Sequence, residues 1–359
     1  MVKARGRTGG RTALITGVSG QDGAYLARDL LARGYRVCGT TRQDRSAPLW
    51  RLAALGVAEA VELHRLDLRD GRAIEALLAE VRPDEVYNLA GESQVAASFE
   101  RPAETGEANA LGVSRLLEAV RRQAPEARYY QASSSEMYGR AAELPQREST
   151  AFHPVSPYGV AKLFAHWITV TYRDAYDLFA CSGILFNHES PLRAPAFVSR
   201  KIVEGLARLR LGAAPPLRLG NLEARRDWGY AADYVRGTWM MLQQERPDDY
   251  VLATGESHSV RELVDCAAAA LGLPLEWEGE GLATVARERG SGRLLLQVDP
   301  ALYRPLDIDE VRGDPGKAAR LLGWKAEVRF ETLVEILAQA ALRQLQTAAA
   351  APAPEPEPA

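Results

Sequence analysis

The stretch TALITGVSGQDGAYLARDLL, residues 12–31, decides the fold. Its first five residues predict a buried strand, and the apolar spacing in AYLARDLL predicts a helix. Gly17, Gly20 and Gly23 lie between the two segments. Glycines at such a turn let the backbone approach a pyrophosphate, which then binds at the helix N-terminus. Because a strand precedes this GxxGxxG spacing and a helix follows it, we predict a dinucleotide site; the alternative is an ordinary βα turn.

The same alternation continues along the chain. Further strands are predicted at 36–41, 61–68, 85–90, 128–134 and 178–186, and longer amphipathic helices at 71–81, 103–122 and 157–176. A helix at 234–243 and a strand at 250–254 are expected to return to the same sheet. This order predicts an α/β fold with a Rossmann-type, doubly wound parallel sheet that is covered by helices on both faces.

The remaining segments predict a second, smaller α/β lobe that binds substrate. We expect a nucleotide-binding domain at 12–190 plus about 228–256, and the smaller lobe at about 191–227 plus 257–346. Residues 1–11 are basic and glycine-rich, without an apolar segment behind them, so they predict a flexible leader. The low-complexity sequence TAAAAPAPEPEPA predicts a disordered tail at 347–359.

The composition restricts the classes of partner. The 359 residues carry a net charge of -3, which does not indicate binding to nucleic acid or to an acidic membrane surface. The three cysteines are far apart, so they predict neither a disulfide framework nor a metal site, and they indicate a reducing, cytoplasmic location. No apolar run approaches the roughly 20 residues that a membrane helix needs.

Two further motifs predict hydride chemistry. QASSSEMYG, residues 131–139, ends a predicted strand, and SPYGVAK, residues 156–162, opens a predicted helix. Tyr158 and Lys162 are four residues apart and share one helix face. A nearby ammonium lowers the pKa of a phenol, so Tyr158 could act as a general base while a hydroxyl of the 133–135 serine run binds the same substrate oxygen. The alternative is an aromatic residue on a core helix with a lysine that reaches solvent.

Glu136 directly follows these serines, and a simple alcohol dehydrogenase does not need it. A carboxylate in a mostly apolar crevice can hold or accept a proton. Oxidation of a sugar hydroxyl to a ketone acidifies the neighbouring C–H, and a base there permits elimination of water. Glu136 therefore indicates a dehydratase, unless it only caps a helix at the surface.

The second predicted strand bears on the choice of cofactor. It ends at Thr40-Thr41-Arg42, where an acidic residue would bind the ribose 2′-hydroxyl of NAD. Arg42 instead suits a 2′-phosphate, so NADP is favoured over NAD; the alternative is a solvated arginine. Asp67 and Leu68, after the third strand, are expected to flank the adenine, although Asp67 could equally cap a helix.

These motifs together resemble those of the GDP-mannose 4,6-dehydratases, members of the extended short-chain dehydrogenase/reductase superfamily. The likeness extends from about Thr12 to about Gln346 and includes GILFNHESP, RLGNLEARRDWG, ATGESHSVRE and YRPLDID. It implies that NADP takes a hydride from C4 of the mannosyl ring with Tyr158 as base. Glu136 then removes the C5 proton, water leaves from C6, and the hydride returns to C6, which gives GDP-4-dehydro-6-deoxy-D-mannose.

The resemblance also assigns site residues, which fall into three groups. The catalytic residues are expected to be Ser134, Glu136, Tyr158 and Lys162. The cofactor-binding residues are expected to be Gly17, Val18, Ser19, Gly20, Gln21, Asp22, Gly23, Arg42, Asp67, Leu68, Ala90, Ser93, Lys162, His188 and Arg193. The substrate-binding residues are expected to be Asn187, Val198, Lys201, Leu219, Asn221, Arg226 and Arg304.

Several positions depart from the family pattern, among them Gln43, Glu104, Leu192 and Ala196. A 4-epimerase, a 4-reductase or a dehydratase acting on a different nucleotide-sugar is therefore an alternative, as is a non-catalytic NADP-binding protein. A 4-epimerase or a 4-reductase would need no elimination base at Glu136. The helix at 157–176 is apolar over much of its girth, which predicts a homodimer through a four-helix bundle or a homotetramer.

Overall fold

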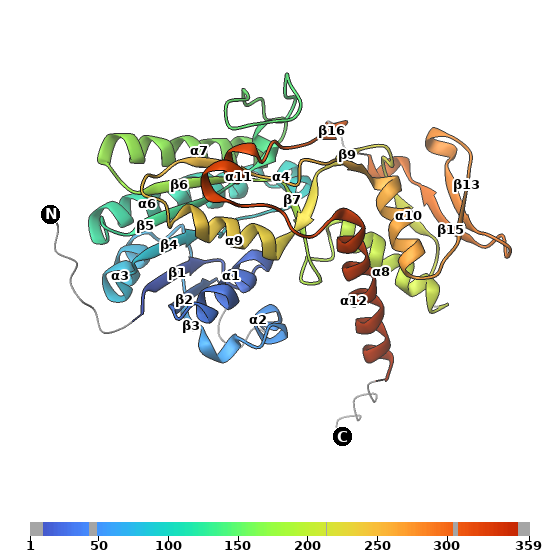
Figure 1. Ribbon diagram of the computed structural model, residues 1–359, viewed down its shortest axis with the longest axis horizontal. Coiled ribbons are helices and arrows are strands. Elements are labelled where there is room, and N and C mark those ends of the chain that lie inside the picture. Colours follow the sequence, from blue (N-terminus) through green and yellow to red (C-terminus); the bar gives the residue numbers. More distant parts are fainter. Residues whose placement is uncertain (1–9, 43–48, 213, 304–307, 351–359) are drawn as a thin grey trace. The chain divides into compact units, whose positions relative to one another are not determined.

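The computed structural model describes residues 10–42, 49–212, 214–303 and 308–350 (Figure 1). The chain forms two compact units. The first contains Met1–His188, Asp227–Ser257 and Val311–Glu327, and the second contains Glu189–Arg226, His258–Glu310 and Val328–Ala359.

The first unit is built on a seven-stranded sheet with the order β11-β6-β5-β4-β1-β2-β3. Every neighbouring pair of these strands is parallel, which confirms the predicted Rossmann-type sheet. The strands are β1 (Thr12–Thr16), β2 (Arg36–Thr41), β3 (Glu62–Arg65), β4 (Glu85–Asn88), β5 (Arg128–Ser134), β6 (Ala180–Leu185) and β11 (Asp249–Leu252). The chain order reverses beside β1, so ligands are expected at the carboxyl ends of β1, β4 and their neighbours.

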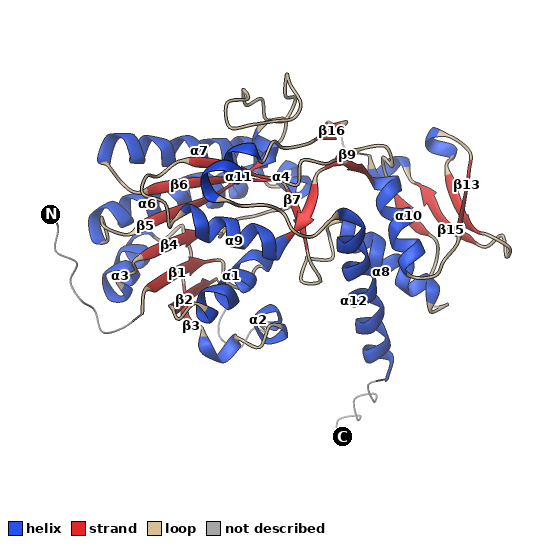
Figure 2. Cartoon of the chain, viewed as in Figure 1, coloured by secondary structure: helices blue, strands red, loops and turns tan. Residues whose placement is uncertain are grey.

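Helices cover this sheet on both faces (Figures 1 and 2). On one face α3 (Gly71–Val81), α6 (Gly112–Gln123) and α7 (Pro157–Tyr176) bury their apolar sides against alternate strand residues. On the other face α1 (Gln21–Ala32) packs against α9 (Ala231–Met241). The shorter helices of this unit are α2 (Trp50–Ala54), η1 (Ala58–Ala60), α4 (Val95–Glu100), α5 (Pro102–Gly106), η3 (Ser135–Met137) and α11 (Gly316–Leu322).

The helix expected at 103–122 is not regular. A π-helical turn, η2 (Glu107–Leu111), separates α5 from α6. This turn carries the buried residue Asn109. Its side-chain amide forms hydrogen bonds with the backbone of Glu92, which follows β4. Such π turns in α-helices often lie at functional sites.

The second unit is an α/β lobe. The helices α8 (Val198–Arg210), α10 (Val260–Ala270) and α12 (Phe330–Ala350) pack against one another. A four-stranded sheet has the order β13-β14-β15-β8, with strands β13 (Leu275–Glu278), β14 (Val285–Glu288), β15 (Leu294–Val298) and β8 (Leu217–Leu219). The remaining short elements of the chain are β7 (Asn187–Glu189), β9 (Arg225–Arg226), β10 (Trp228–Tyr230), β12 (His258–Ser259), η4 (Gly281–Ala283), η5 (Pro300–Leu302) and β16 (Glu310–Val311).

Assigning all of 257–346 to the smaller lobe was wrong, because Val311–Glu327 belongs to the first unit. Long-range contacts hold this segment there. Trp324 Nε1 donates to the Asp233 carbonyl at 2.8 Å, and Gly313 pairs with Gln146 in an isolated parallel bridge. A Cβ on Gly313 would meet the Ala253 side chain at 2.4 Å, so the backbone packs closely against the end of β11.

The predicted flexible ends are also shorter than expected. Arg11, the last residue of the predicted leader, donates to Tyr35 and to the buried Glu85 carboxylate. At the other end α12 continues to Ala350, three residues beyond the expected start of the tail. Alanine has the highest helix propensity, which explains why the TAAA segment extends the helix. None of the described helices is both long and apolar enough to cross a membrane.

Candidate active site

The glycine turn after β1 has the geometry of a phosphate cradle. Gly17 has a φ of 72° and accepts the Gly20 N–H at 3.0 Å, and a Cβ on Gly17 would meet the Ala90 backbone at 2.9 Å. A Cβ on Gly23 would meet the Gly17 carbonyl at 2.5 Å. Helix α1 begins at Gln21, and the N-cap residue Gly20 offers no side-chain cap, so the first N–H groups of the helix can bind a pyrophosphate. The turn therefore fits a dinucleotide.

His188 is joined to the first turn of α1. Its Nε2 lies 2.9 Å from Asp22 Oδ2, and its Nδ1 lies 2.7 Å from the Phe186 carbonyl. Gln21 Nε2 donates to the His188 carbonyl at 3.1 Å. The structure thus brings His188, predicted from the NHESP segment, beside two residues predicted from the glycine turn.

The residues predicted to be catalytic lie at the carboxyl end of β5 and in the first turns of α7. Ser134 is the last residue of β5, and Glu136 lies in η3, where its N–H donates to Ser134 Oγ at 3.3 Å. Ser156 Oγ caps α7 by accepting the Gly159 N–H at 3.0 Å, with Pro157 as the first helical residue. This start places Tyr158 and Lys162 one helical turn apart on the face that packs against β5.

Close backbone packing holds these two segments together. A Cβ on Gly159 would meet the Glu136 carbonyl at 2.6 Å, so only glycine permits this approach of α7 to η3. Lys162 Nζ donates to the Ala132 carbonyl in β5 at 2.9 Å and lies 5.7 Å from the centroid of the Tyr158 ring. The start of α7, which carries Tyr158, therefore packs against the backbone of Glu136, 22 positions earlier in the sequence.

Burial sets the protonation of the lysine. The Lys162 side chain is 8% exposed, and desolvation lowers its pKa from 10.5 to about 8, with the Asp22 carboxylate acting in the opposite direction. At neutral pH the ammonium is still mostly protonated. Lys162 can therefore hold a positive charge near the Tyr158 ring during proton transfer.

The proposed adenosine end of the cofactor site contains several charged groups. Arg42, after β2, donates from Nη2 to Glu92 Oε1 at 3.1 Å. The Arg69 guanidinium bonds the Asp67 carboxylate and lowers its pKa to about 2. Leu68 is buried in the core cluster that includes residues of α6, so its side chain packs inside the protein. Gln43 lies outside the described residues.

The predicted substrate residues of the second unit come from α8, β8 and β9. Lys201 on α8 is half-buried, and desolvation lowers its pKa, while Asp299 raises it. The Asp299 N–H donates to the Leu219 carbonyl in β8 at 2.7 Å, so Lys201 and Leu219 approach the same carboxylate residue. Arg226 Nη1 donates to the Ile308 carbonyl at 2.7 Å.

The other predicted residues are placed as follows. Arg193 pairs with Glu189 at 3.1 Å, Asn221 Oδ1 accepts the Glu223 N–H, and Val198 begins α8. Asn187 begins β7 in the first unit, Ser93 is exposed after β4, and Arg304 lies outside the described residues.

Sequence reasoning missed residues that reach the site through long-range contacts. Arg51, on α2, donates to the Ser19 carbonyl in the glycine turn at 3.1 Å. His166 is buried on α7, and its Nδ1 lies 3.2 Å from Ser133 Oγ. Neither contact follows from a local motif, although the i, i+4 relation of Lys162 and His166 was a signal available in the sequence.

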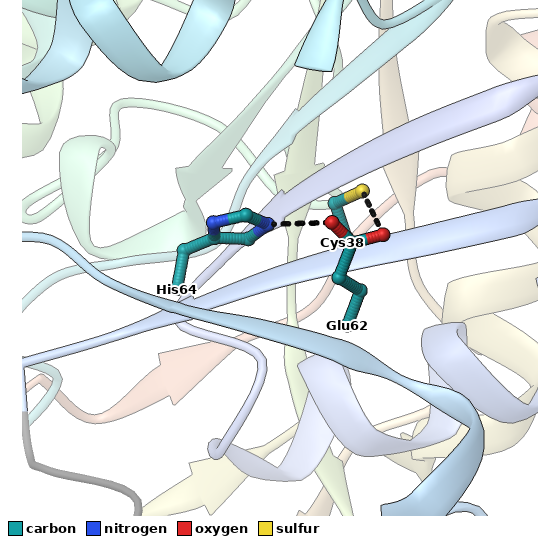
Figure 3. Close-up of side chains that lie close together, drawn as sticks. All are labelled: Cys38, Glu62 and His64. Carbon is teal, nitrogen blue, oxygen red and sulfur yellow. Dashed lines mark hydrogen bonds and ion pairs between the residues drawn. The ribbon is translucent and has the colours of Figure 1, made fainter. Parts of the chain in front are cut away.

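One group of side chains among the described residues offers metal-ligand atoms, namely Cys38 of β2 with Glu62 and His64 of β3 (Figure 3). Burial raises the pKa of the Cys38 thiol to about 11, so the sulfur keeps its proton near neutral pH. The Arg36 guanidinium also occupies Glu62, with Nη2 2.7 Å from Oε2. A protonated thiol and a competing cation favour a hydrogen-bonded group over a metal centre.

Solved structures place this arrangement in a known class. A UDP-glucose 4-epimerase of Thermus thermophilus, in complex with NAD, is 27% identical with a TM-score of 0.76 and covers 92% of this chain and 98% of its own. RMD from Pseudomonas aeruginosa, complexed with NADPH, has the same fold with a TM-score of 0.72 and 24% identity, over 93% of this chain and 99% of its own. The sheet, the glycine turn and the Tyr158–Lys162 pair define the class of the extended short-chain dehydrogenases/reductases, and the glycine turn fits a dinucleotide.

Sequence comparison gives the particular family. The profile described as GDP-mannose 4,6 dehydratase matches residues 14–337. The GDP-mannose 4,6-dehydratase of Vibrio cholerae serotype O1 is 45% identical over 356 residues, which cover 94% of this chain and 95% of that protein. The chain belongs to the GDP-mannose 4,6-dehydratase family.

Proposed function

We propose that this protein converts GDP-D-mannose to GDP-4-dehydro-6-deoxy-D-mannose with NADP as its cofactor. Family membership supports the substrate and the reaction. The observation that supports the proposed mechanism is the packing of α7 on η3, because it brings the start of α7, with Tyr158, against the segment that carries Ser134 and Glu136.

Each catalytic side chain has a separate task in this proposal. When bound, the nicotinamide supplies hydride transfer, from C4 of the sugar and later to C6. Tyr158 takes the proton of the 4-hydroxyl, and the Lys162 ammonium stabilises its phenolate. The Ser134 hydroxyl donates a hydrogen bond to the same sugar oxygen. Glu136 removes the C5 proton and transfers it to the C6 hydroxyl, which then leaves as water.

We assign binding of the nucleotide-sugar to the substrate-binding residues that the resemblance to the family predicts. Arginine can grip a diphosphate with two parallel hydrogen bonds, and Lys201 adds a further positive charge. In the cofactor half, Arg42 suits the 2′-phosphate of NADP, which is why we propose NADP over NAD.

We also propose that the protein is a homodimer and acts in the cytoplasm. Helix α7 exposes apolar side chains on one side, with Val160, Phe164 and Trp167 at 55%, 43% and 53% exposure. Their spacing of three and four residues forms one stripe, and a second copy of the same helix would bury it. The free cysteines Cys38, Cys181 and Cys266 suit a reducing compartment.

The test is mass spectrometry of the purified protein with GDP-mannose, with and without added NADP. We expect the nucleotide-sugar to lose one water without net reduction of the cofactor. UDP-glucose is the matched control substrate. A product of unchanged mass that differs from GDP-mannose in chromatographic retention would favour a 4-epimerase. Loss of two hydrogens, with reduction of the cofactor, would favour a 4-reductase running in reverse.

A further inference from the structure

Arg42 is the expected ligand of the 2′-phosphate, but its guanidinium lies on an acidic partner. Its Nη2 donates to Glu92 Oε1 at 3.1 Å, with the two side chains 63% and 34% exposed. Arg42 follows β2, and Glu92 follows β4, on the other side of β1. The arginine therefore reaches across the carboxyl end of β1, where the glycine turn receives the cofactor.

The carboxylate side of this pair is held in place. The Glu92 N–H donates to Asn109 Oδ1 at 2.8 Å, and Asn109 Nδ2 donates to the Glu92 carbonyl at 2.8 Å. Asn109 is 1% exposed in the π-helical turn, and a Cβ on Gly91 would meet its Oδ1 at 2.6 Å. Glu92 is thus anchored through its backbone, whereas Arg42 has a long side chain that can exchange one anion for another.

The two cofactors would meet this pair differently. The 2′-phosphate of NADP is an anion that must take the Arg42 guanidinium from Glu92 and accept a negative charge nearby. The ribose of NAD carries only a hydroxyl there, which can donate to a carboxylate. The Arg42–Glu92 ion pair therefore weakens the binding of NADP, whereas the binding of NAD is unchanged or strengthened.

We propose that Glu92 is a specificity-determining residue that competes with the 2′-phosphate of NADP for Arg42 and so weakens the preference for NADP over NAD. This inference rests on the proposed function in one respect, namely the nicotinamide dinucleotide site at the carboxyl ends of β1 and β2. It concerns the choice between cofactors and not the reaction of the sugar.

The test is a double-mutant cycle that measures binding. The dissociation constants of NADP+ and NAD+ are determined by calorimetry for the nucleotide-free full-length protein and for Glu92→Gln, Arg42→Ala and the double variant. Glu126→Gln is the matched control, because Glu126 is exposed in the turn before β5, at the amino ends of the strands and away from the proposed cofactor site. It removes the same charge without touching Arg42.

Glu92→Gln should raise the ratio of NADP+ affinity to NAD+ affinity about three- to tenfold, as expected when a surface ion pair no longer competes with the 2′-phosphate for Arg42. In the Arg42→Ala background the same change should have less than about a twofold effect. An unchanged ratio, an equal rise without Arg42, or an equal rise in Glu126→Gln would overturn the inference. Failure to bind either nucleotide would refute the proposed function itself.

Discussion

Replacing Lys162 with methionine removes a buried positive charge at the carboxyl end of β5. The side chain is 8% exposed, and burial lowers its pKa from 10.5 to about 8. This interval corresponds to about 3 kcal/mol, because one pKa unit is worth about 1.4 kcal/mol. The folded protein therefore bears a cost of about 3 kcal/mol for keeping the ammonium charged at neutral pH.

The sign of the pH dependence follows from this lowered pKa. Below about pH 8 the folded and unfolded chains both hold the proton, so the full cost is present. Between about pH 8 and pH 10.5 the unfolded chain keeps a proton that the folded chain releases, so the stability of the wild type rises with pH. Between about pH 7 and pH 10.5 the free energy of unfolding of the wild type should therefore rise by about 3 kcal/mol relative to that of Lys162→Met.

Urea unfolding of the nucleotide-free protein, followed by tryptophan fluorescence, measures this difference. Five of the six tryptophans lie in the first unit, so the signal reports mainly the unit that contains Lys162. The hydrogen bond to Ala132 is lost at every pH, and it therefore shifts both measurements alike. Lys325→Met is the matched control, because Lys325 is exposed. A difference between wild type and Lys162→Met that varies with pH by less than about 1 kcal/mol would refute the reasoning.

Four further predictions concern the proposed catalytic groups, the core of the first unit and the dimer. Glu136→Gln should slow water loss by about 10²- to 10⁴-fold yet still permit reduction of the cofactor by GDP-mannose, visible by absorbance; full water loss would contradict its role. Tyr158→Phe should slow cofactor reduction by a similar factor, while the dissociation constant of NADP+ in calorimetry changes less than about threefold. Asp227→Ala should lower the free energy of unfolding by about 3 kcal/mol or more in urea titrations, because three backbone N–H groups lose the buried carboxylate that accepts them; Asp227→Asn should lose less. Trp167→Glu should convert the proposed dimer to a monomer in light scattering, and an unchanged mass would place the interface elsewhere.

The fold of the first unit could be predicted because its signals are local. Strand and helix patterns depend on residues within one turn or one strand, and the glycine spacing depends on three residues of one loop. The predicted strands β1, β2 and β5 and helix α7 have the same bounds in the structure. The segment Val311–Glu327 was misplaced because its position depends on the Trp324–Asp233 and Gln146–Gly313 contacts, which no local pattern reveals.

The same division applies to the candidate site. The sequence by itself determined the parallel α/β architecture, the glycine turn and the spacing of Tyr158 and Lys162, because each is encoded by neighbouring residues. Only the tertiary structure decided that Glu92 holds Arg42 and that Asn109 anchors Glu92, since these contacts join residues 50 and 17 positions apart. Ion pairs and side-chain hydrogen bonds of this kind depend on where strands β1, β2 and β4 end in space, and that arrangement exists only after the sheet has formed.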